Sequence, residues 1–228
     1  MSFEEPARPF EQFDMLDVDA ITTPEFEQQW AEYIYLLLRT EPLHAAQEIY
    51  TTTQLCAASP EAHLALMDLG EKYLYNPNSP LRSDELFIPI LESVVASPAI
   101  DESLKIRPTQ LLEIASRNRL GSIAADFELP QGGTMHSVAA PFTLLYFFDD
   151  HCADCKRTSD LLASSQLLEQ LTSDGTIAMI KVVATPNSPL DTLYDLKAIP
   201  TLYLLDAQKR VVMKDATVES ILNILPTL

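Results

Sequence analysis

The chain has 228 residues, 47% of them hydrophobic, which is enough for two packed cores. Its 33 acidic residues outnumber the 15 lysines and arginines, and the formal charge of −18 disfavours binding to nucleic-acid phosphates or anionic membrane surfaces. The 3 cysteines are too few for a disulfide-stapled scaffold, and no apolar run reaches the ~18 residues of a transmembrane helix, so no membrane insertion is expected.

Residues 1–120 are predicted to form an all-α domain of about five helices. Thr23-Pro24-Glu25, Ser59-Pro60-Glu61 and Ser83-Asp84-Glu85 each place a capping side chain where a helix would begin. Pro42 and Pro108 are expected to open two more helices. Apolar residues recur at helical spacing behind these starts, and no strand is predicted in this half.

After Gly121 the pattern changes to that of an α/β domain, residues 121–228. Apolar runs typical of buried strands alternate with helical patterns in this half. We expect strands at 142–148, 177–183, 201–205 and 211–213, and helices at 153–171, from 188 onward, and at 218–225.

The motif Cys152-Ala153-Asp154-Cys155 lies where a buried strand gives way to a helix. The free N–H groups and the dipole of a helix N-terminus stabilise a thiolate, which is the nucleophilic form of cysteine. The spacing of three residues brings the second sulfur within reach of the first. We therefore expect Cys152 to attack a substrate disulfide and Cys155 to resolve the mixed disulfide.

Two other interpretations of the pair stay open: a zinc half-site and two inert buried cysteines. Zinc normally takes four ligands, and the remaining candidates form no second pair at ligand spacing, so no metal is expected. Those candidates are Cys56, His44, His63, His136 and His151.

A peroxiredoxin is disfavoured because Asp149 stands where such enzymes place Thr or Ser, three residues before the attacking cysteine.

Ile199-Pro200-Thr201 directly precedes a predicted strand, a position in which a proline can be cis. Here the sequence resembles the thioredoxin-like proteins of the bacterial envelope, the TlpA and ResA group. The resemblance covers about half of the chain. It rests on Asn118-Arg119-Leu120-Gly121, Ala125-Asp126-Phe127, Leu144-Leu145-Tyr146-Phe147-Phe148, Cys152-x-x-Cys155-Lys156 and residues 194–206.

The resemblance implies a thioredoxin-like fold with Cys152 and Cys155 as catalytic residues. It also implies a cis Pro200 beside them, with the backbone of Ile199, Pro200 and Thr201 binding an extended substrate segment. No cofactor is expected, and the partners would be protein thiols or disulfides and an upstream thiol reductant. The helical half is similar to a domain of unknown function that precedes such domains in exported bacterial proteins.

The location implied by the resemblance is the cell envelope or periplasm. Residues 1–10 have neither a basic start nor an apolar stretch, so the sequence shows no signal peptide. A cytoplasmic protein and a mature form from which a signal was removed both fit this observation.

The motif departs from the family in ways that bear on proton handling. His151 and Asp154 occupy positions where the family usually has Trp and Pro. Relatives often carry a buried acidic residue, or a Glu shortly after the second cysteine, whereas this chain has Tyr146 in the strand and Thr158 in the helix. His151 is a candidate for proton transfer. Asp149, Asp150 and Asp154 oppose thiolate formation, which favours a reducing couple.

The sequence therefore predicts a thiol-disulfide oxidoreductase that reduces protein disulfides. A second hypothesis is a binding or scaffold protein, in which the thioredoxin fold is a platform and the helical domain recruits a partner, because a fold does not by itself fix a function.

Overall fold

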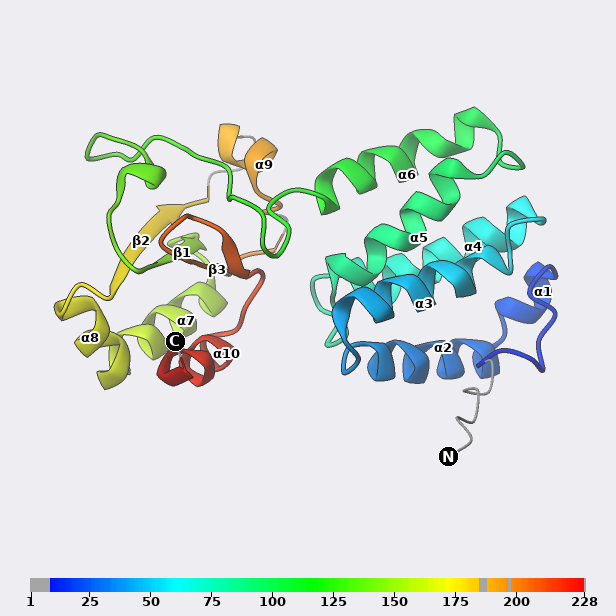
Figure 1. Cartoon of the computed structure of the whole chain (residues 1–228), viewed down its shortest axis with the longest axis horizontal. Coiled ribbons are helices and arrows are strands. Elements are labelled where there is room, and N and C mark those ends of the chain that lie inside the picture. The colour runs from blue at the N-terminus through cyan, green and yellow to red at the C-terminus, as the bar shows by residue number, and fades with distance from the viewer. Residues whose placement is uncertain (1–8, 185–187, 197, 228) are drawn as a thin grey trace. The chain divides into compact units, whose positions relative to one another are not determined.

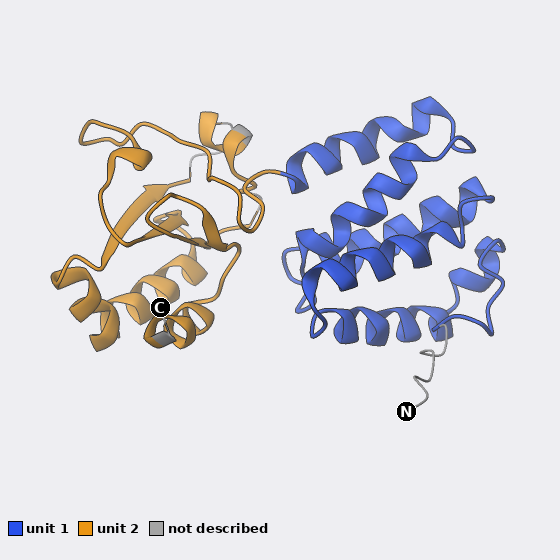
Figure 2. Ribbon diagram, in the orientation of Figure 1, with its two compact units in different colours: residues 1–116 blue, residues 117–228 orange. Residues whose placement is uncertain are grey.

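The computed structural model describes residues 9–184, 188–196 and 198–227. The chain divides into two compact units, residues 1–116 and 117–228, called here the N-terminal and C-terminal units (Figure 2). Independent folding of two domains with a boundary at residue 120 stays a prediction. No helix in the described ranges is both long and apolar enough to span a bilayer.

The N-terminal unit is helical, as predicted. Thr23, Ser59 and Ser83 cap three of its helices, each side-chain oxygen accepting a hydrogen bond from a backbone N–H in the first turn. In chain order (Figure 1) the helices are α1 (Val18–Ile21), α2 (Pro24–Leu37), α3 (Pro42–Gln54), α4 (Pro60–Gly70), the π-helical turn η1 (Glu71–Tyr75), α5 (Asp84–Ala96) and α6 (Glu102–Ala115).

The predicted helix start at Pro108 is wrong. Helix α6 begins earlier, at Glu102, because the carboxylate of Asp101 caps it by accepting a hydrogen bond from the Ser103 N–H. Pro108 lies buried in the helix interior, where it removes one backbone hydrogen bond. The helix continues because it packs along α5, so tertiary burial overrides the local preference.

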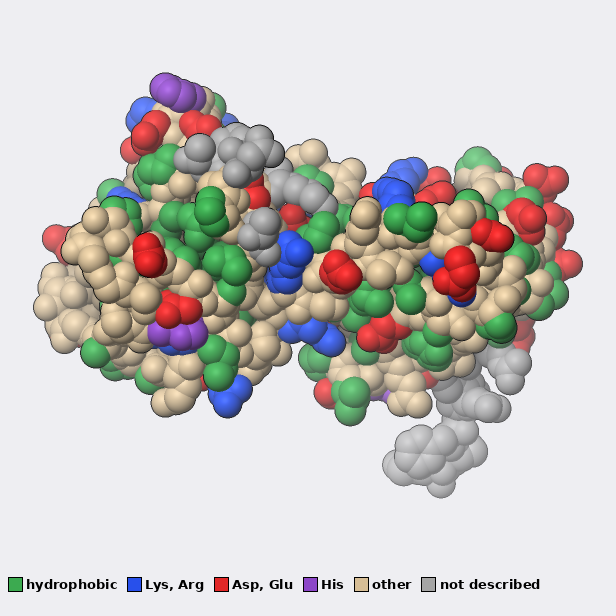
Figure 3. Space-filling view, turned by 90° about the horizontal axis from the view of Figure 1, so that it is seen from above, with side chains coloured by type: hydrophobic (Ala, Val, Ile, Leu, Met, Phe, Trp, Pro, Cys, Tyr) green, Lys and Arg blue, Asp and Glu red, His purple; other side chains and the backbone are tan. Residues whose placement is uncertain are grey.

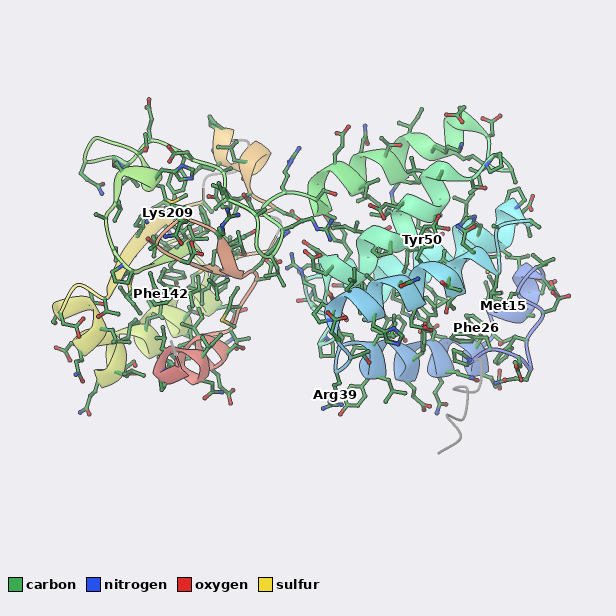
Figure 4. The ribbon with its side chains drawn as sticks, in the orientation of Figure 1. Met15, Phe26, Arg39, Tyr50, Phe142 and Lys209 are labelled. Carbon is green, nitrogen blue, oxygen red and sulfur yellow. The ribbon has the colours of Figure 1, made fainter. Side chains whose placement is uncertain are left out.

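The core of the N-terminal unit contains a cluster of buried aromatic rings. Phe26 and Trp30 from α2 are fully buried, and Phe10 lies 5.0 Å and 5.9 Å from their ring centroids. Met15 joins the same core, and Figure 4 labels it together with Phe26. Trp30 is the only tryptophan of the chain, so its fluorescence reports on this core alone.

A polar cluster is also buried in this unit. His63 is fully buried, its Nε2 lies 2.7 Å from the hydroxyl oxygen of Ser93, and the amide of Gln54 donates to the same oxygen at 2.7 Å. Burial lowers the pKa of His63, because the charged imidazolium loses its hydration there.

The C-terminal unit is built on a four-stranded sheet that matches all four predicted strands. The sheet has the order β2-β1-β3-β4, in which β1 pairs parallel with β2 and antiparallel with β3, and β3 pairs antiparallel with β4. The strands are β1 (Phe142–Phe148), β2 (Ile177–Val183), β3 (Thr201–Leu205) and β4 (Val211–Met213).

Helices cover both faces of this sheet (Figure 1). The core on one face, which includes Leu144 and Tyr146, is closed by α7, α8 and α10, and the core on the other face, which includes Leu145 and Phe147, is closed by α9 and the segment before β1. The helices are α7 (Ala153–Ser164), α8 (Gln166–Ser173), α9 (Pro189–Leu193) and α10 (Val218–Ile224), with 3-10 turns η2 (Met135–Ser137) and η3 (Leu225–Thr227).

The single helix predicted for residues 153–171 is in fact two. Ser165 has an extended backbone and ends α7, and its hydroxyl then caps α8 by accepting from the Leu168 N–H. Serine competes with helix formation by bonding to nearby backbone groups, which explains the break.

Lys209, in the turn before β4, is hydrogen-bonded to residues at the start of β1. Figure 4 labels Lys209 and Phe142, the first residue of that strand. Its side chain is buried, and Nζ donates to the carbonyl of Val138 at 2.8 Å and to the hydroxyl of Thr143 at 2.7 Å. Burial lowers the pKa of Lys209, and the two bonds satisfy a cation that would otherwise be costly to bury.

We predict that acid destabilises the N-terminal unit through His63. Its folded-state pKa lies below the unfolded value of about 6.5, so below that pH the unfolded chain binds more protons and the free energy of unfolding falls. Urea unfolding followed by Trp30 fluorescence should therefore show lower stability at pH 5.5 than at pH 7, by at most about 1.4 kcal/mol per pH unit for one proton.

His63→Gln should flatten this dependence, and the exposed His44→Gln should leave it as in the wild type. An unchanged slope in His63→Gln would show that another group is responsible.

Candidate dithiol site

Cys152 is the N-cap residue of α7, immediately after the loop that follows β1. Its Sγ accepts a hydrogen bond from the Cys155 N–H at 3.1 Å, in the place usually taken by a serine or aspartate oxygen. The free N–H groups of the first helical turn and the helix dipole favour negative charge at this sulfur. The local fold thus places a nucleophilic group where its anion is stabilised.

Cys155 lies one turn into the helix and is 1% exposed, whereas Cys152 is partly exposed. The Sγ of Cys155 accepts a hydrogen bond from the Asp149 N–H at 3.5 Å. The pKa of Cys155 is raised to about 11, chiefly by burial and in addition by the Cys152 sulfur and the Asp149 carboxylate, against the opposing effect of the Asp149 N–H. All three cysteines are free thiols.

The Ile199–Pro200 peptide bond is cis, as predicted, and it lies beside the first cysteine. The Cys152 thiol donates to the Ile199 carbonyl at 3.9 Å, a long contact that a sulfur donor can make. Thr201 is buried at the start of β3, and its hydroxyl donates to the Ala198 carbonyl. The structure therefore brings the Ile199 carbonyl to Cys152, and the binding of substrate by residues 199–201 stays a prediction.

A solved structure resembles the chain over its whole length. The crystal structure of a thioredoxin-like protein from Bacteroides caccae is 31% identical, covers 100% of this chain and 95% of its own, and superposes with a TM-score of 0.87. This chain belongs to the thioredoxin-like family. A family model described as a domain of unknown function (DUF5106) matches residues 9–118.

Two further solved structures resemble the C-terminal half alone. The C-terminal domain of an uncharacterised protein from Bacteroides fragilis is 30% identical over 48% of this chain and 98% of its own, with a TM-score of 0.43. The thioredoxin domain of a thiol-disulfide oxidoreductase from Bacteroides vulgatus is 14% identical over 48% and 96%, with a TM-score of 0.40. No curated protein matches the chain.

His151 stands before the first cysteine of the thioredoxin-like motif, and its side chain faces solvent. Its backbone N–H donates to the Asp149 carboxylate at 2.6 Å, which shapes the loop between β1 and α7. The role of its imidazole in proton transfer stays a prediction.

Salt bridges partly neutralise the charges around the motif. Asp154 pairs with Arg157 and Lys156 pairs with Asp160 at 3.0 Å, all exposed. Exposed pairs of this kind contribute little to stability. Neither pair includes Asp149 or Asp150, so these salt bridges leave the loop acidic there. Acidic side chains are also spread over the visible face of the molecule (Figure 3). Within the described ranges, no group of three or more His, Cys, Asp or Glu residues is placed to hold a metal ion.

Sequence reasoning missed the polar contacts beneath the site. The Tyr146 hydroxyl donates to the Cys155 carbonyl at 2.6 Å and lies 3.0 Å from the Ser159 hydroxyl. The one available signal was the helical spacing of four between Cys155 and Ser159, which places both on one face of α7. That face turns toward β1 only in the folded unit.

We predict that the two thiols differ sharply in alkylation. Below pH 9 a mild alkylating reagent should label Cys152 and leave Cys155 unlabelled, because Cys155 is buried and has a pKa of about 11. Peptide mapping after brief labelling measures the ratio. Cys56 is an internal control, because it is buried and its pKa is raised to about 12, so it should react only after unfolding. Faster labelling of Cys155 than of Cys152 would reverse the assignment.

Proposed function

We propose that this thioredoxin-like protein is a thiol-disulfide oxidoreductase that reduces disulfides in partner proteins through Cys152 and Cys155. The observation that carries the proposal is the Cys155 N–H directed at Cys152 Sγ at 3.1 Å, with the second thiol buried behind it. Such an arrangement stabilises the thiolate of an accessible cysteine and protects its resolving partner from solvent.

In the first step the Cys152 thiolate attacks one sulfur of a substrate disulfide. The substrate S–S bond breaks, a mixed disulfide with Cys152 forms, and the other substrate sulfur leaves as a thiolate that takes a proton from solvent. The backbone of Ile199, Pro200 and Thr201 is proposed to hold the substrate segment, because the Ile199 carbonyl lies 3.9 Å from the attacking sulfur.

In the second step Cys155 gives its proton to solvent and its thiolate attacks Cys152 Sγ. The S–S bond between Cys152 and the substrate breaks, and the second substrate sulfur leaves as a thiolate that takes a proton from solvent. The protein is then oxidised to the Cys152–Cys155 disulfide, and the substrate has gained two electrons. The Cys152 sulfur helps to raise the pKa of Cys155 in the dithiol. In the mixed disulfide Cys152 carries no charge, so this contribution disappears when Cys155 must ionise. An upstream thiol reductant returns the protein to the dithiol.

The alternative is a scaffold protein in which the helical unit recruits a partner and the cysteines remain unused. The two functions differ in whether Cys152 and Cys155 alternate between a dithiol and a disulfide.

We place the protein in the bacterial envelope by its sequence resemblance, with the cytoplasm as the alternative location.

Cysteine variants test the cycle. Cys152→Ser should abolish reduction of a protein disulfide such as that of insulin, because no nucleophile remains. Cys155→Ser should trap a mixed disulfide on Cys152, visible by mass spectrometry, because the resolving thiol is missing. Cys56→Ser is the matched control and should keep wild-type activity, since Cys56 lies in the other unit. Activity retained in Cys152→Ser, or a wild type that forms no reversible disulfide, would favour the scaffold function.

We predict a reducing couple, closer to the about −270 mV of thioredoxin than to the about −120 mV of DsbA. Burial raises the pKa of Cys155 and the charge of the Asp149 carboxylate adds to the rise, and negative charge near the pair disfavours the ionised dithiol that makes a strong oxidant. Equilibration of the full chain with glutathione buffers measures the potential.

Asp149→Asn should make the couple more oxidising by less than about 30 mV, because solvent screens the charge within about 8 Å. The exposed Asp174→Asn should leave it unchanged. A wild-type potential near that of DsbA would contradict the direction of electron flow and leave the cycle itself intact.

A further inference from the structure

Tyr146 is a polar residue in β1, a strand whose five inner residues are all buried. It is fully buried, belongs to the core on the α7 face of the sheet, and stacks on Phe148 with ring centroids 5.1 Å apart. A phenylalanine would fill the same space, so the hydroxyl needs a separate explanation.

The hydroxyl joins β1 to two successive turns of α7. It donates to the Cys155 carbonyl at 2.6 Å and lies 3.0 Å from the Ser159 hydroxyl oxygen. Burial raises the pKa of Tyr146, and negative charge on the two nearby cysteines raises it too, so the phenol keeps its proton and remains a donor when a thiolate forms.

The residue held by this bond is the one that contacts the attacking sulfur. Cys155 receives the Tyr146 hydroxyl at its carbonyl and presents its N–H to Cys152 Sγ at 3.1 Å. The Asp149 N–H, at the end of β1, in turn donates to Cys155 Sγ at 3.5 Å. The Asp149 contact depends on how the first turn of α7 lies against β1, and the Cys155 N–H contact depends on how the backbone of Cys155 is held within that turn.

We propose that Tyr146, together with Ser159, is a positioning residue that fixes the first turn of α7 on β1 and so keeps the Cys155 N–H directed at Cys152 Sγ. The redox consequence rests on the proposed function, and the effect on thiol reactivity does not. Without the hydroxyl, the turn is free to shift and the thiolate of Cys152 loses part of its stabilisation.

Tyr146→Phe tests the proposal in the full chain, since it removes only the hydroxyl. We expect the alkylation rate of Cys152 at neutral pH to fall about three- to tenfold, the effect of weakening one hydrogen bond. The couple should become more reducing by up to about 30 mV, which corresponds to a tenfold change in equilibrium constant.

Tyr194→Phe is the matched control. The Tyr194 hydroxyl is bonded to a backbone carbonyl, that of Ala125 at 2.5 Å, and its ring is equally buried, in the core on the other face of the sheet. This variant should lose stability and keep the wild-type rate and pH profile of Cys152 alkylation. A slowing confined to Tyr146→Phe supports positioning, and equal rates in the wild type and both variants would overturn it.

Ser159→Ala covers the case in which Tyr146→Phe does not fold. It leaves the bond from Tyr146 to Cys155 in place and removes the second partner of the hydroxyl, so a smaller slowing is expected and a wild-type rate would overturn the proposal. A wild type that alkylates normally at Cys152 but forms no reversible disulfide would refute the proposed function alone.

Discussion

The contact between the Cys155 N–H and Cys152 Sγ exists only because α7 begins at the residue after Cys152. A helix that began one turn later would leave both sulfurs in a loop, without the free N–H groups and the dipole that favour a thiolate. The chemistry proposed for this thioredoxin-like protein thus depends on a helix start. The same start buries the second thiol against the sheet while the first remains accessible.

Strand β1 provides the support for that helix start. It pairs with β2 on one side and β3 on the other, so it is held within the sheet, and it delivers the chain to the cysteine loop at Phe148. Strand β3 runs antiparallel to it, and its first residue follows Pro200, so the Pro200 turn arrives at the end of β1 where the cysteines lie. Pairing of these two strands therefore brings together segments that are distant in the sequence.

The electrostatic environment of the site favours negative charge on one sulfur and opposes it on the other. The helix N-terminus favours an anion at Cys152, whereas burial and the neighbouring carboxylate of Asp149 hold the proton on Cys155. Negative charge on the Cys152 sulfur also raises the pKa of Cys155, so the two thiols do not ionise together readily. The two residues are chemically identical, and their environments alone make one thiol accessible at a helix N-terminus and keep the other buried with its proton.

The sequence by itself determined the four strands, three capped helix starts in the first half and the cysteine pair, because these depend on local capping, apolar runs and proline, which act within a few residues. Sequence reasoning failed to place two helix boundaries. Helix α6 continues through Pro108 because it packs along α5, and α7 ends at Ser165 because that serine bonds to the backbone of the next helix. The family resemblance implied a cis Pro200 beside the cysteines, and the tertiary structure supplied the contact itself, between the Cys152 thiol and the Ile199 carbonyl. Only the tertiary structure placed the Tyr146 hydroxyl beneath Cys155. Those contacts join separate elements, and strand pairing and helix packing set their geometry.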